Sequence, residues 1–226
     1  MLARLVPESH YQRRHLAAFS EIGSGNPELA RLFFGYYGAV FADGALSVRQ
    51  KALAALAVAH AVQCPYCIDA YTSGALEKGA DLEQLTEAVQ IAAATRAAST
   101  AAYGAQAMEQ ARWLELAEGA DAPAQAYFRR GQAKTPIEAP RLDAWLKSTL
   151  LEEGALDSFD KAVIYAACAH GLQCPYSIEA ATARALELGA KLDALTEAVH
   201  VACAIRGGAS LVHGIQMLEQ VRTQTM

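Results

Sequence analysis

The sequence predicts an all-α fold made of two tandem helical repeats that pack together as one helical bundle unit. No stretch alternates apolar and polar residues with the period of two that a strand requires, whereas alanine, leucine and glutamate supply helix propensity throughout. The chain also matches itself without a gap at an offset of 110 residues, and about half of the positions in residues 44–110 recur in residues 154–220. A duplicated helical unit follows from these two observations.

Composition and charge exclude several classes of protein. The 226 residues are 53% hydrophobic, with no apolar run long enough to span a bilayer, which predicts a soluble protein with a large core. The net charge of −5 comes from 24 acidic and 19 basic residues without a basic block, so we expect neither nucleic acid nor a membrane as partner. Residues 1–15 lack the apolar core of a secretory signal. A cytoplasmic location is therefore expected, where the five cysteines favour catalysis or burial over structural disulfides.

The amino-terminal part predicts two helices. A short helix over Ser9–Ile22 is expected to close at Gly23. Asn26 is a helix-capping residue, and the proline that follows it suits the first helical position, so a second helix should begin there and run to about Phe41. Its aromatic residues cover more than one face, which predicts a helix buried on several sides.

The next segments carry clear start and stop signals. Ser47 is expected to cap an alanine-rich helix that ends near a short turn at Gln63. Because proline is favoured in the first turn of a helix, Pro65 predicts that the following helix begins at or just after Cys64. That helix should stop at Gly79.

Further boundaries divide the chain into two repeats and a connector. Asp81 and Gln84 resemble a capping box that opens a helix over residues 81–99. Glycines and prolines then interrupt the chain around a short predicted helix at residues 124–130. The predicted organisation is a first repeat at residues 1–117, a connector at 118–139 and a second, degenerate repeat at 140–226.

The segment HAVQCPYCIDAYT places two thiols, Cys64 and Cys67, three residues apart at a predicted helix start. Unpaired N–H groups and the positive end of the helix dipole stabilise a thiolate there, so at least one of the two should have a lowered pKa. The second copy reads HGLQCPYSIEAAT, in which Cys67 becomes Ser177 and Tyr71 becomes Ala181. Two-thiol chemistry is therefore expected in the first copy alone.

The remaining candidate residues are expected to have structural roles. The other cysteines, at positions 168, 174 and 203, are predicted to be small buried side chains. Arg96 and Arg206 are predicted to close a helix or to pair with a glutamate. A zinc site would need four ligands, and only scattered histidines and cysteines are available, so we expect no metal and no other cofactor.

The tandem helical units and the CPYC helix that ends at a glycine resemble the alkylhydroperoxidase AhpD-like and carboxymuconolactone decarboxylase superfamily, over residues 30–112 and 140–222. The resemblance implies a thiol-dependent peroxidase that reduces small hydroperoxides, with Cys67 attacking and Cys64 forming the disulfide. It also implies regeneration by a lipoyl or thioredoxin-like dithiol. Because the family forms rings, it implies a homo-oligomer, here a trimer or a larger ring.

The sequence departs from the proton relay of the resembled peroxidases. The family's glutamate lies twelve residues before the first cysteine, where this chain has Ala52, and its histidine lies four residues after the second, where this chain has Tyr71. His60, four residues before Cys64, is a candidate replacement base, and a capping or core role is the alternative because it recurs as His170. Helical spacing places Tyr71 on the face of the two cysteines, where its hydroxyl is a candidate hydrogen-bond partner for Cys67.

Two other functions remain open from the sequence. One is a carboxymuconolactone decarboxylase-like lyase in which the thiols are incidental, and such an enzyme should gather cationic residues around a carboxylated substrate. The other is a non-enzymatic helical oligomer that senses redox state by forming a disulfide without turnover.

Overall fold

The computed structural model describes residues 16, 19–23, 25–113 and 139–224. These residues form nine α-helices, and no strand occurs among them, which confirms the predicted all-α class. The helices are α1 (Phe19–Ile22), α2 (Pro27–Val40), α3 (Val48–Ala61), α4 (Pro65–Glu77), α5 (Leu82–Trp113), α7 (Ala139–Leu151), α8 (Ser158–Leu172), α9 (Pro175–Glu187) and α10 (Leu192–Gln224).

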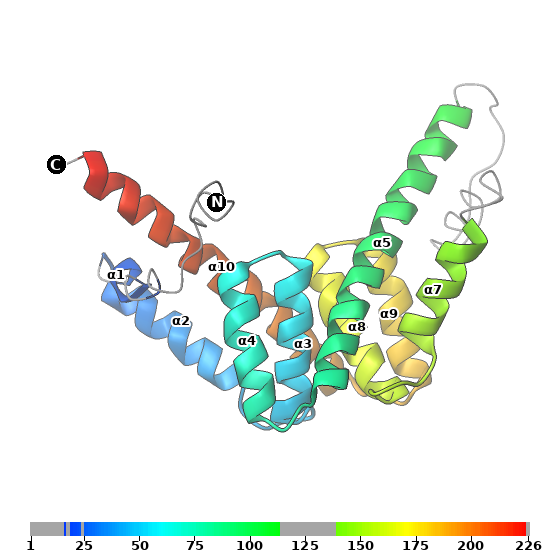
Figure 1. Ribbon diagram of the computed structural model, residues 1–226, viewed down its shortest axis with the longest axis horizontal. Coiled ribbons are helices and arrows are strands. Elements are labelled where there is room, and N and C mark those ends of the chain that lie inside the picture. Colours follow the sequence, from blue (N-terminus) through cyan, green and yellow to red (C-terminus); the bar gives the residue numbers. More distant parts are fainter. Residues whose placement is uncertain (1–15, 17–18, 24, 114–138, 225–226) are drawn as a thin grey trace, which may run out of the picture.

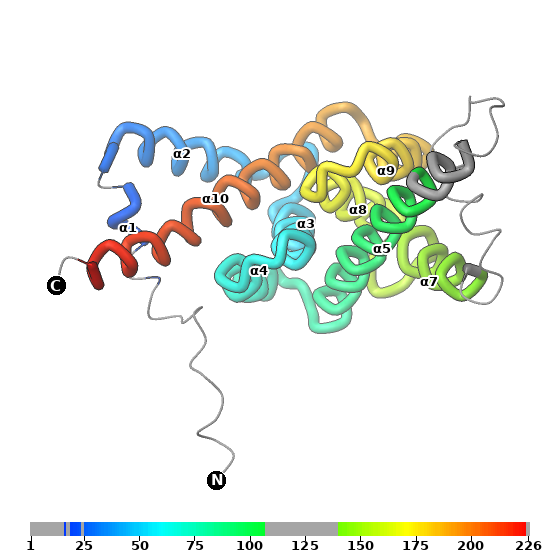
Figure 2. The backbone as a smooth tube through the Cα atoms, turned by 90° about the horizontal axis from the view of Figure 1, so that it is seen from above, coloured from blue at the N-terminus to red at the C-terminus, as the bar shows by residue number. Residues whose placement is uncertain are grey.

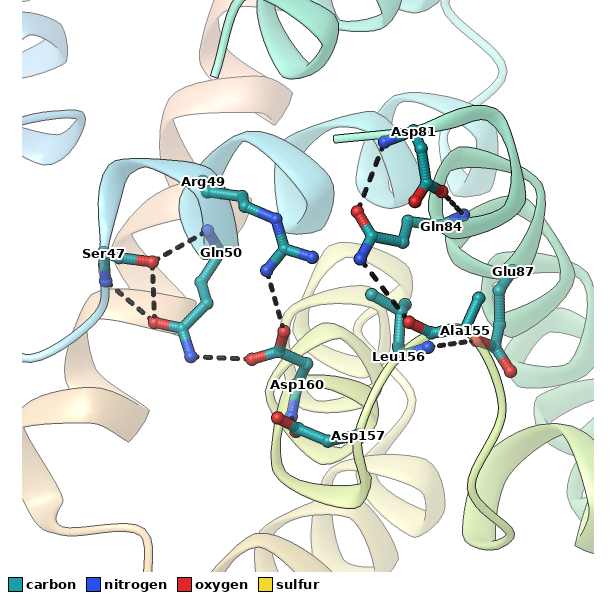
Figure 3. A network of polar contacts seen from close by, with 10 residues as sticks. All are labelled: Ser47, Arg49, Gln50, Asp81, Gln84, Glu87, Ala155, Leu156, Asp157 and Asp160. Atoms are coloured by element: carbon teal, nitrogen blue, oxygen red, sulfur yellow. Dashed lines mark hydrogen bonds and ion pairs between the residues drawn. The ribbon is translucent and has the colours of Figure 1, made fainter. Parts of the chain in front are cut away.

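The predicted helix starts are confirmed. The side chain of Asn26 accepts a hydrogen bond from a backbone N–H in the first turn of α2. Ser47 and Gln50 form a reciprocal capping box at the start of α3, and Asp81 and Gln84 form another at the start of α5. Figure 3 shows both capping pairs.

The turns on either side of the CPYC helix have the same backbone in both copies. Gln63 and its equivalent Gln173 are left-handed, with φ of 57° and 56°, and they redirect the chain after α3 and α8. Gly79 and Gly189, with φ of 85° and 84°, end α4 and α9 in a conformation that favours glycine. The repeat identified from the sequence is therefore a repeat in structure.

The long helix of each copy packs on its own copy and also on the other copy. We refer to this arrangement as the exchange of the long helices. Helices α3 and α8 pack against each other at the centre, with α4 and α9 beside them. Helix α5 packs on α3 of its own copy and on α7, α8 and α9 of the second copy. Helix α10 packs on α8 and, from the first copy, on α1 to α4. Figures 1 and 2 show α2 lying along the outer half of α10 and α7 lying beside α5.

Two buried ion pairs hold each long helix against the central helix of the other copy. Lys51 on α3 is 2% exposed, and its Nζ lies 3.0 Å from Oε2 of Glu197 on α10. The equivalent Lys161 on α8 is 1% exposed, and its Nζ lies 2.5 Å from Oε1 of Glu87 on α5. Each pair joins one copy to the other. Removing either partner would leave a buried charge uncompensated, so the pairs hold the long helices in their exchanged positions.

A polar contact also joins the starts of the central helices (Figure 3). Gln50 donates from Nε2 to Oδ1 of Asp160 at 2.7 Å, and these two residues occupy equivalent positions in the two copies. Arg49 donates to Oδ2 of the same carboxylate at 3.4 Å. The amino-terminal ends of α3 and α8 are thus tied together on one side of the molecule.

Two features differ from the sequence prediction, and two predicted helices lie wholly or partly outside the described residues. Helix α2 is not buried on several sides, because Val40 is its one buried residue and Phe34 is 50% exposed. The reason is that α2 lies along the protruding half of α10 rather than inside the bundle. Helix α5 runs well past residue 99, to Trp113. Of the predicted first helix, Ser9–Ile22, the structure describes residue 16 and the α1 segment, and the predicted helix at 124–130 lies outside the described residues.

Helix α10 also has the length and apolar composition that would suffice to cross a membrane. Its buried residues, which include Val201, Ile205 and Ile215, belong to the shared core with α3 and α8. Packing of these residues between the two repeats accounts for part of that composition.

Candidate functional site

The two thiols lie at the start of α4, as predicted. Cys64 is the N-cap residue of the helix, and Cys67 lies in its first turn. The backbone of Cys64 is held at both ends, since its N–H donates to the Ala59 carbonyl at 3.1 Å and its carbonyl accepts from the Ile68 N–H at 2.9 Å. Both residues are buried, with 1% and 8% of their surface exposed, and no disulfide joins them in the structure.

The surroundings make the two thiols electrostatically unequal. A hydrogen bond from the Cys67 thiol is the main influence that lowers the pKa of the Cys64 thiol, to about 6. Burial opposes this shift, whereas the Cys67 backbone N–H and the ring of His213 both favour the Cys64 thiolate. The same hydrogen bond, together with burial, raises the pKa of the Cys67 thiol. These shifts favour Cys64 as the thiolate of the reduced pair and Cys67 as its hydrogen-bond donor.

The histidine beside this thiolate comes from the other copy. His213 lies on α10 and packs edge-on against Tyr66 of the CPYC segment, with ring centroids 6.0 Å apart. His213 was not predicted from the sequence, because its equivalent in the first copy is Tyr103 and no local spacing connects it to Cys64. Tyr103 makes the matching contact in the second copy, edge-on to Tyr176 at 5.6 Å. Knowledge of the exchanged long helices would have been needed to find it.

The ring of His60 contacts a backbone carbonyl of its own helix. Its Nδ1 lies 3.0 Å from the Leu56 carbonyl in its own helix. His170 repeats this contact with the Ala166 carbonyl at 2.8 Å, in a copy that has no thiol pair. The repetition is typical of a structural role near the end of α3 and α8.

Tyr71 lies next to the thiols but bonds elsewhere. Its hydroxyl forms a short hydrogen bond with the hydroxyl of Tyr37 on α2, and its ring stacks on Phe41 at 5.8 Å. Burial and then the Tyr37 hydroxyl raise the pKa of Tyr71, and both Cys67 and Cys64 add to this effect. The phenol therefore remains protonated beside Cys67.

The second copy retains a related pocket without the thiol pair. Ser177, which replaces the second cysteine, shares a hydrogen bond of 2.8 Å with Ser99 of α5. Burial of Cys174 disfavours its thiolate, but hydrogen bonds from Ser99 and Ser177 outweigh burial and lower the pKa. Burial raises the pKa of Cys168. The prediction that the remaining cysteines are buried is right for Cys168 and Cys174 and wrong for Cys203, which is exposed on α10.

An open pocket of about 500 Å³ lies beside the thiol pair, with Cys64 and His213 in its wall. Arg96 of α5 and Arg206 of α10 enter it from equivalent positions. Their guanidinium groups donate to the carbonyls of Ala61 and Gly171, at the carboxyl-terminal ends of α3 and α8, which confirms that both arginines close a helix. The pocket is lined by Ala61, Val62, Cys64, Arg96, Gly171, Leu172, Arg206, Ala209, Ser210 and His213. No group of three or more side chains able to bind a metal occurs in the described parts of the chain.

Comparison with known proteins gives consistent results. A protein from Paracoccus denitrificans, named uncharacterized protein 4 in cox locus, is 41% identical over 92 residues, which cover 41% of this chain and 83% of that protein. A crystal structure of a protein from Burkholderia xenovorans, described as a gamma-carboxymuconolactone decarboxylase subunit, superposes with a TM-score of 0.73. That match is 16% identical and covers 95% of this chain and 97% of the other, so it shows a shared fold.

The model of the carboxymuconolactone decarboxylase family matches this chain twice, once in each repeat. The matched residues are 27–110 and 140–220, which together make up most of the sequence. They run from α2 through the long helix in the first copy, and over the equivalent helices in the second. The chain therefore belongs to the carboxymuconolactone decarboxylase family, as a member with two tandem copies of the family's helical unit.

Proposed function

We propose that this protein is a thiol-dependent peroxidase that reduces organic hydroperoxides through a dithiol and disulfide cycle at Cys64 and Cys67. The observation that carries the proposal is the polarised thiol pair, in which the thiolate of Cys64 lines an open pocket and receives a hydrogen bond from Cys67. A low-pKa thiolate at the wall of a pocket, next to a second thiol, is an arrangement suited to peroxide chemistry.

In the proposed cycle, Cys64, Cys67 and His213 take part in three steps that balance in atoms and electrons. The Cys64 thiolate attacks the terminal oxygen of the hydroperoxide, the O–O bond breaks, and Cys64 becomes a sulfenic acid. The departing alkoxide takes a proton from the His213 ring and leaves as an alcohol. Cys67 then attacks the sulfur of the sulfenic acid, and its thiol proton leaves with the hydroxyl group as water. A lipoyl or thioredoxin-like dithiol restores both thiols and is itself oxidised.

This order of attack differs from the order that the family resemblance implies. The resemblance assigns the attack to Cys67, but Cys67 is the donor of the pair and burial raises its pKa further. Cys64 lines the pocket, whereas Cys67 faces the ring cluster of Tyr37 and Tyr71. We therefore assign the attack to Cys64 and the resolving step to Cys67.

Hydroperoxide consumption, measured with and without dihydrolipoamide, tests the proposal. We expect sustained turnover only when the dithiol is present, and loss of consumption in Cys64→Ser. Cys174→Ser is the matched control, because it removes the equivalent cysteine of the second copy and should leave the rate unchanged. Equal consumption by wild type and Cys64→Ser would rule out the proposed chemistry.

A lyase acting on a carboxylated substrate is the second candidate. The specific observation in its favour is that Arg96 and Arg206 meet in the pocket beside Cys64. Turnover of a carboxylated lactone that survives Cys64→Ser and Cys67→Ser would favour this alternative. Formation of the disulfide without any turnover would instead favour a redox sensor.

A further inference from the structure

We infer that the pocket between the two repeats contains an anion subsite, formed by Arg96 and Arg206, that holds the carboxylate of an organic substrate while its reactive end lies at Cys64. The inference rests on the proposed function for the identity of the reactive end, a hydroperoxide. It adds the class of substrate: organic hydroperoxides that carry a carboxylate.

The first observation is the position of the two arginines. They lie 110 residues apart in the sequence, on α5 and α10, and both line the pocket that Cys64 and His213 also line. Because the long helices are exchanged, neither copy alone places two arginines at this point. The subsite therefore belongs to the junction of the two repeats.

The second observation is the charge balance. Within the described residues, no carboxylate forms an ion pair with Arg96 or Arg206. Each arginine faces the carboxyl-terminal end of a central helix, which carries about half a negative charge. Two helix ends offset about one of the two positive charges. The remaining positive charge is shared between the Cys64 thiolate, which lines the same pocket, and a bound anion.

The third observation is the supply of hydrogen-bond donors. A guanidinium group is always charged and has five N–H donors in a planar arrangement that matches a carboxylate. One donor group of Arg96 bonds the Ala61 carbonyl, and one of Arg206 bonds the Gly171 carbonyl. The remaining donors of the two groups bond no other group in the described part of the protein, so they are available to a carboxylate.

The rest of the lining selects for an organic acid over a bare inorganic anion. Val62, Leu172 and Ala209 present apolar surface in the same pocket, next to the cationic pair. A hydrocarbon body would cover this surface while its carboxylate meets the arginines. The volume of about 500 Å³ lies within the range of small-molecule sites.

A protection experiment tests the subsite without any peroxide. Reduced protein is alkylated with iodoacetamide in the presence of para-isopropylbenzoate or its neutral isostere para-isopropylbenzamide, and each cysteine is followed by mass mapping. We expect the benzoate to slow the alkylation of Cys64 and the benzamide to have little effect. Exposed Cys203 is the internal control, and its alkylation should not change with either compound.

Variants of Arg206 test whether the protection of Cys64 by the benzoate depends on the charge of this side chain. Arg206→Gln keeps a polar side chain with N–H donors but removes the charge, and it should weaken benzoate binding by about tenfold or more. Arg206→Lys, which keeps the charge, should retain part of the protection. Arg31→Gln is the matched control, since Arg31 pairs with Glu28 on the exposed surface of α2 and should bind as wild type does. Thermal melting of each variant verifies the fold.

Kinetics then identify the substrate class. We expect a para-carboxylate derivative of cumene hydroperoxide to be reduced with a higher kcat/KM than cumene hydroperoxide, and Arg206→Gln to abolish the difference. Equal protection by the benzoate and the benzamide, or unchanged benzoate binding in Arg206→Gln, would overturn the subsite. If the benzoate protects Cys64 but neither hydroperoxide is consumed, the anion subsite is supported and the peroxidase proposal fails.

Discussion

At the scale of single residues, the chemistry depends on an unequal pair of thiols. Two cysteines in the first turn of a helix would both benefit from the helix dipole, yet their mutual hydrogen bond lowers one pKa and raises the other. His213 adds to this asymmetry because it lies against Cys64. The residue that tunes the first-copy thiol is thus supplied by the second copy.

The pH dependence of Cys64 alkylation tests the role of His213. The rate should rise with pH as the thiolate forms, with a midpoint near the pKa of about 6. In His213→Tyr, which introduces the residue found at the equivalent position of the first copy, the midpoint should move upward by about one pH unit or more because a favourable partner is lost. Rapid quenching and mass mapping of the Cys64 peptide give the profile.

The matched control for this profile is Tyr103→His. It places a histidine at the equivalent position beside the second-copy site and should leave the Cys64 midpoint unchanged. An unchanged midpoint in His213→Tyr would show that the ring does not stabilise the thiolate.

Trapping of the sulfenic acid identifies the attacking thiol. After one equivalent of hydroperoxide, Cys67→Ser should accumulate a sulfenic acid at Cys64 that dimedone labels, because the resolving thiol is missing. Cys64→Ser should give little label at Cys67, because burial still raises the pKa of Cys67 after the Cys64 thiol is removed, and the pocket is lined by Cys64 rather than by Cys67. Mass mapping locates the adduct. The opposite pattern, with strong label at Cys67 in Cys64→Ser, would restore the order of attack that the family resemblance implies.

At the scale of helices, the loop before each central helix is built around a glutamate from the other copy. The carboxylate of Glu197 accepts from the N–H groups of Ala45 and Leu46, each at 2.9 Å, in addition to its contact with Lys51. A Cβ added to Gly44 would lie 2.0 Å from this carboxylate, which explains why glycine occupies the position. Gly154 stands in the same relation to Glu87.

Neutralising either glutamate should destabilise the fold. Glu197→Gln leaves the buried ammonium of Lys51 without its counter-ion, and Glu87→Gln does the same for Lys161, so each should cost about 3–5 kcal/mol of unfolding free energy. Urea denaturation measures the change. Glu77→Gln, on the exposed end of α4, is the control and should stay within about 0.5 kcal/mol of wild type.

A pH titration of stability gives an independent check on Glu197. Burial disfavours its ionised form, but the two N–H donors and Lys51 outweigh burial and lower its pKa. A carboxylate with a lowered folded-state pKa contributes its full stability above the unfolded-state value and loses it as the pH falls through the folded-state value. Glu197→Gln should therefore flatten the acid side of the stability profile. A stability loss in Glu197→Gln no larger than in Glu77→Gln would exclude the bridging role.

At the scale of the whole molecule, the two repeats could be predicted from the sequence, but the packing of each long helix on the other copy could not. Capping residues, prolines and left-handed glycines act within a few residues, so the starts of α3, α4 and α5 could be read locally. The pairing of α10 with the first copy depends on contacts between segments more than 100 residues apart, for which local patterns carry no signal. His213 was missed for this reason, and Arg96 and Arg206 were recognised as helix-closing residues without being brought to one pocket.

Self-association is the prediction that belongs to the whole molecule. Helices α2 and α10 leave large apolar side chains exposed along the arm that extends from the bundle, including Leu29, Leu32 and Phe34 at 62%, 51% and 50% exposure. Apolar surface of this extent on a protruding arm is typical of an interface. With two repeats in each chain, a trimer would contain six copies of the helical unit, and closed rings are a common solution for such units. We therefore expect a trimer or a larger ring at micromolar concentration, measured by sedimentation equilibrium.

Leu32→Glu should shift the population toward monomer with little change in melting temperature of the dissociated chain, because this side chain is already exposed within one chain. Leu186→Glu, at a leucine that is 54% exposed on α9, provides the matched control away from the arm. A wild-type chain that sediments as a stable monomer would contradict the prediction, and equal dissociation by both variants would move the interface away from α2.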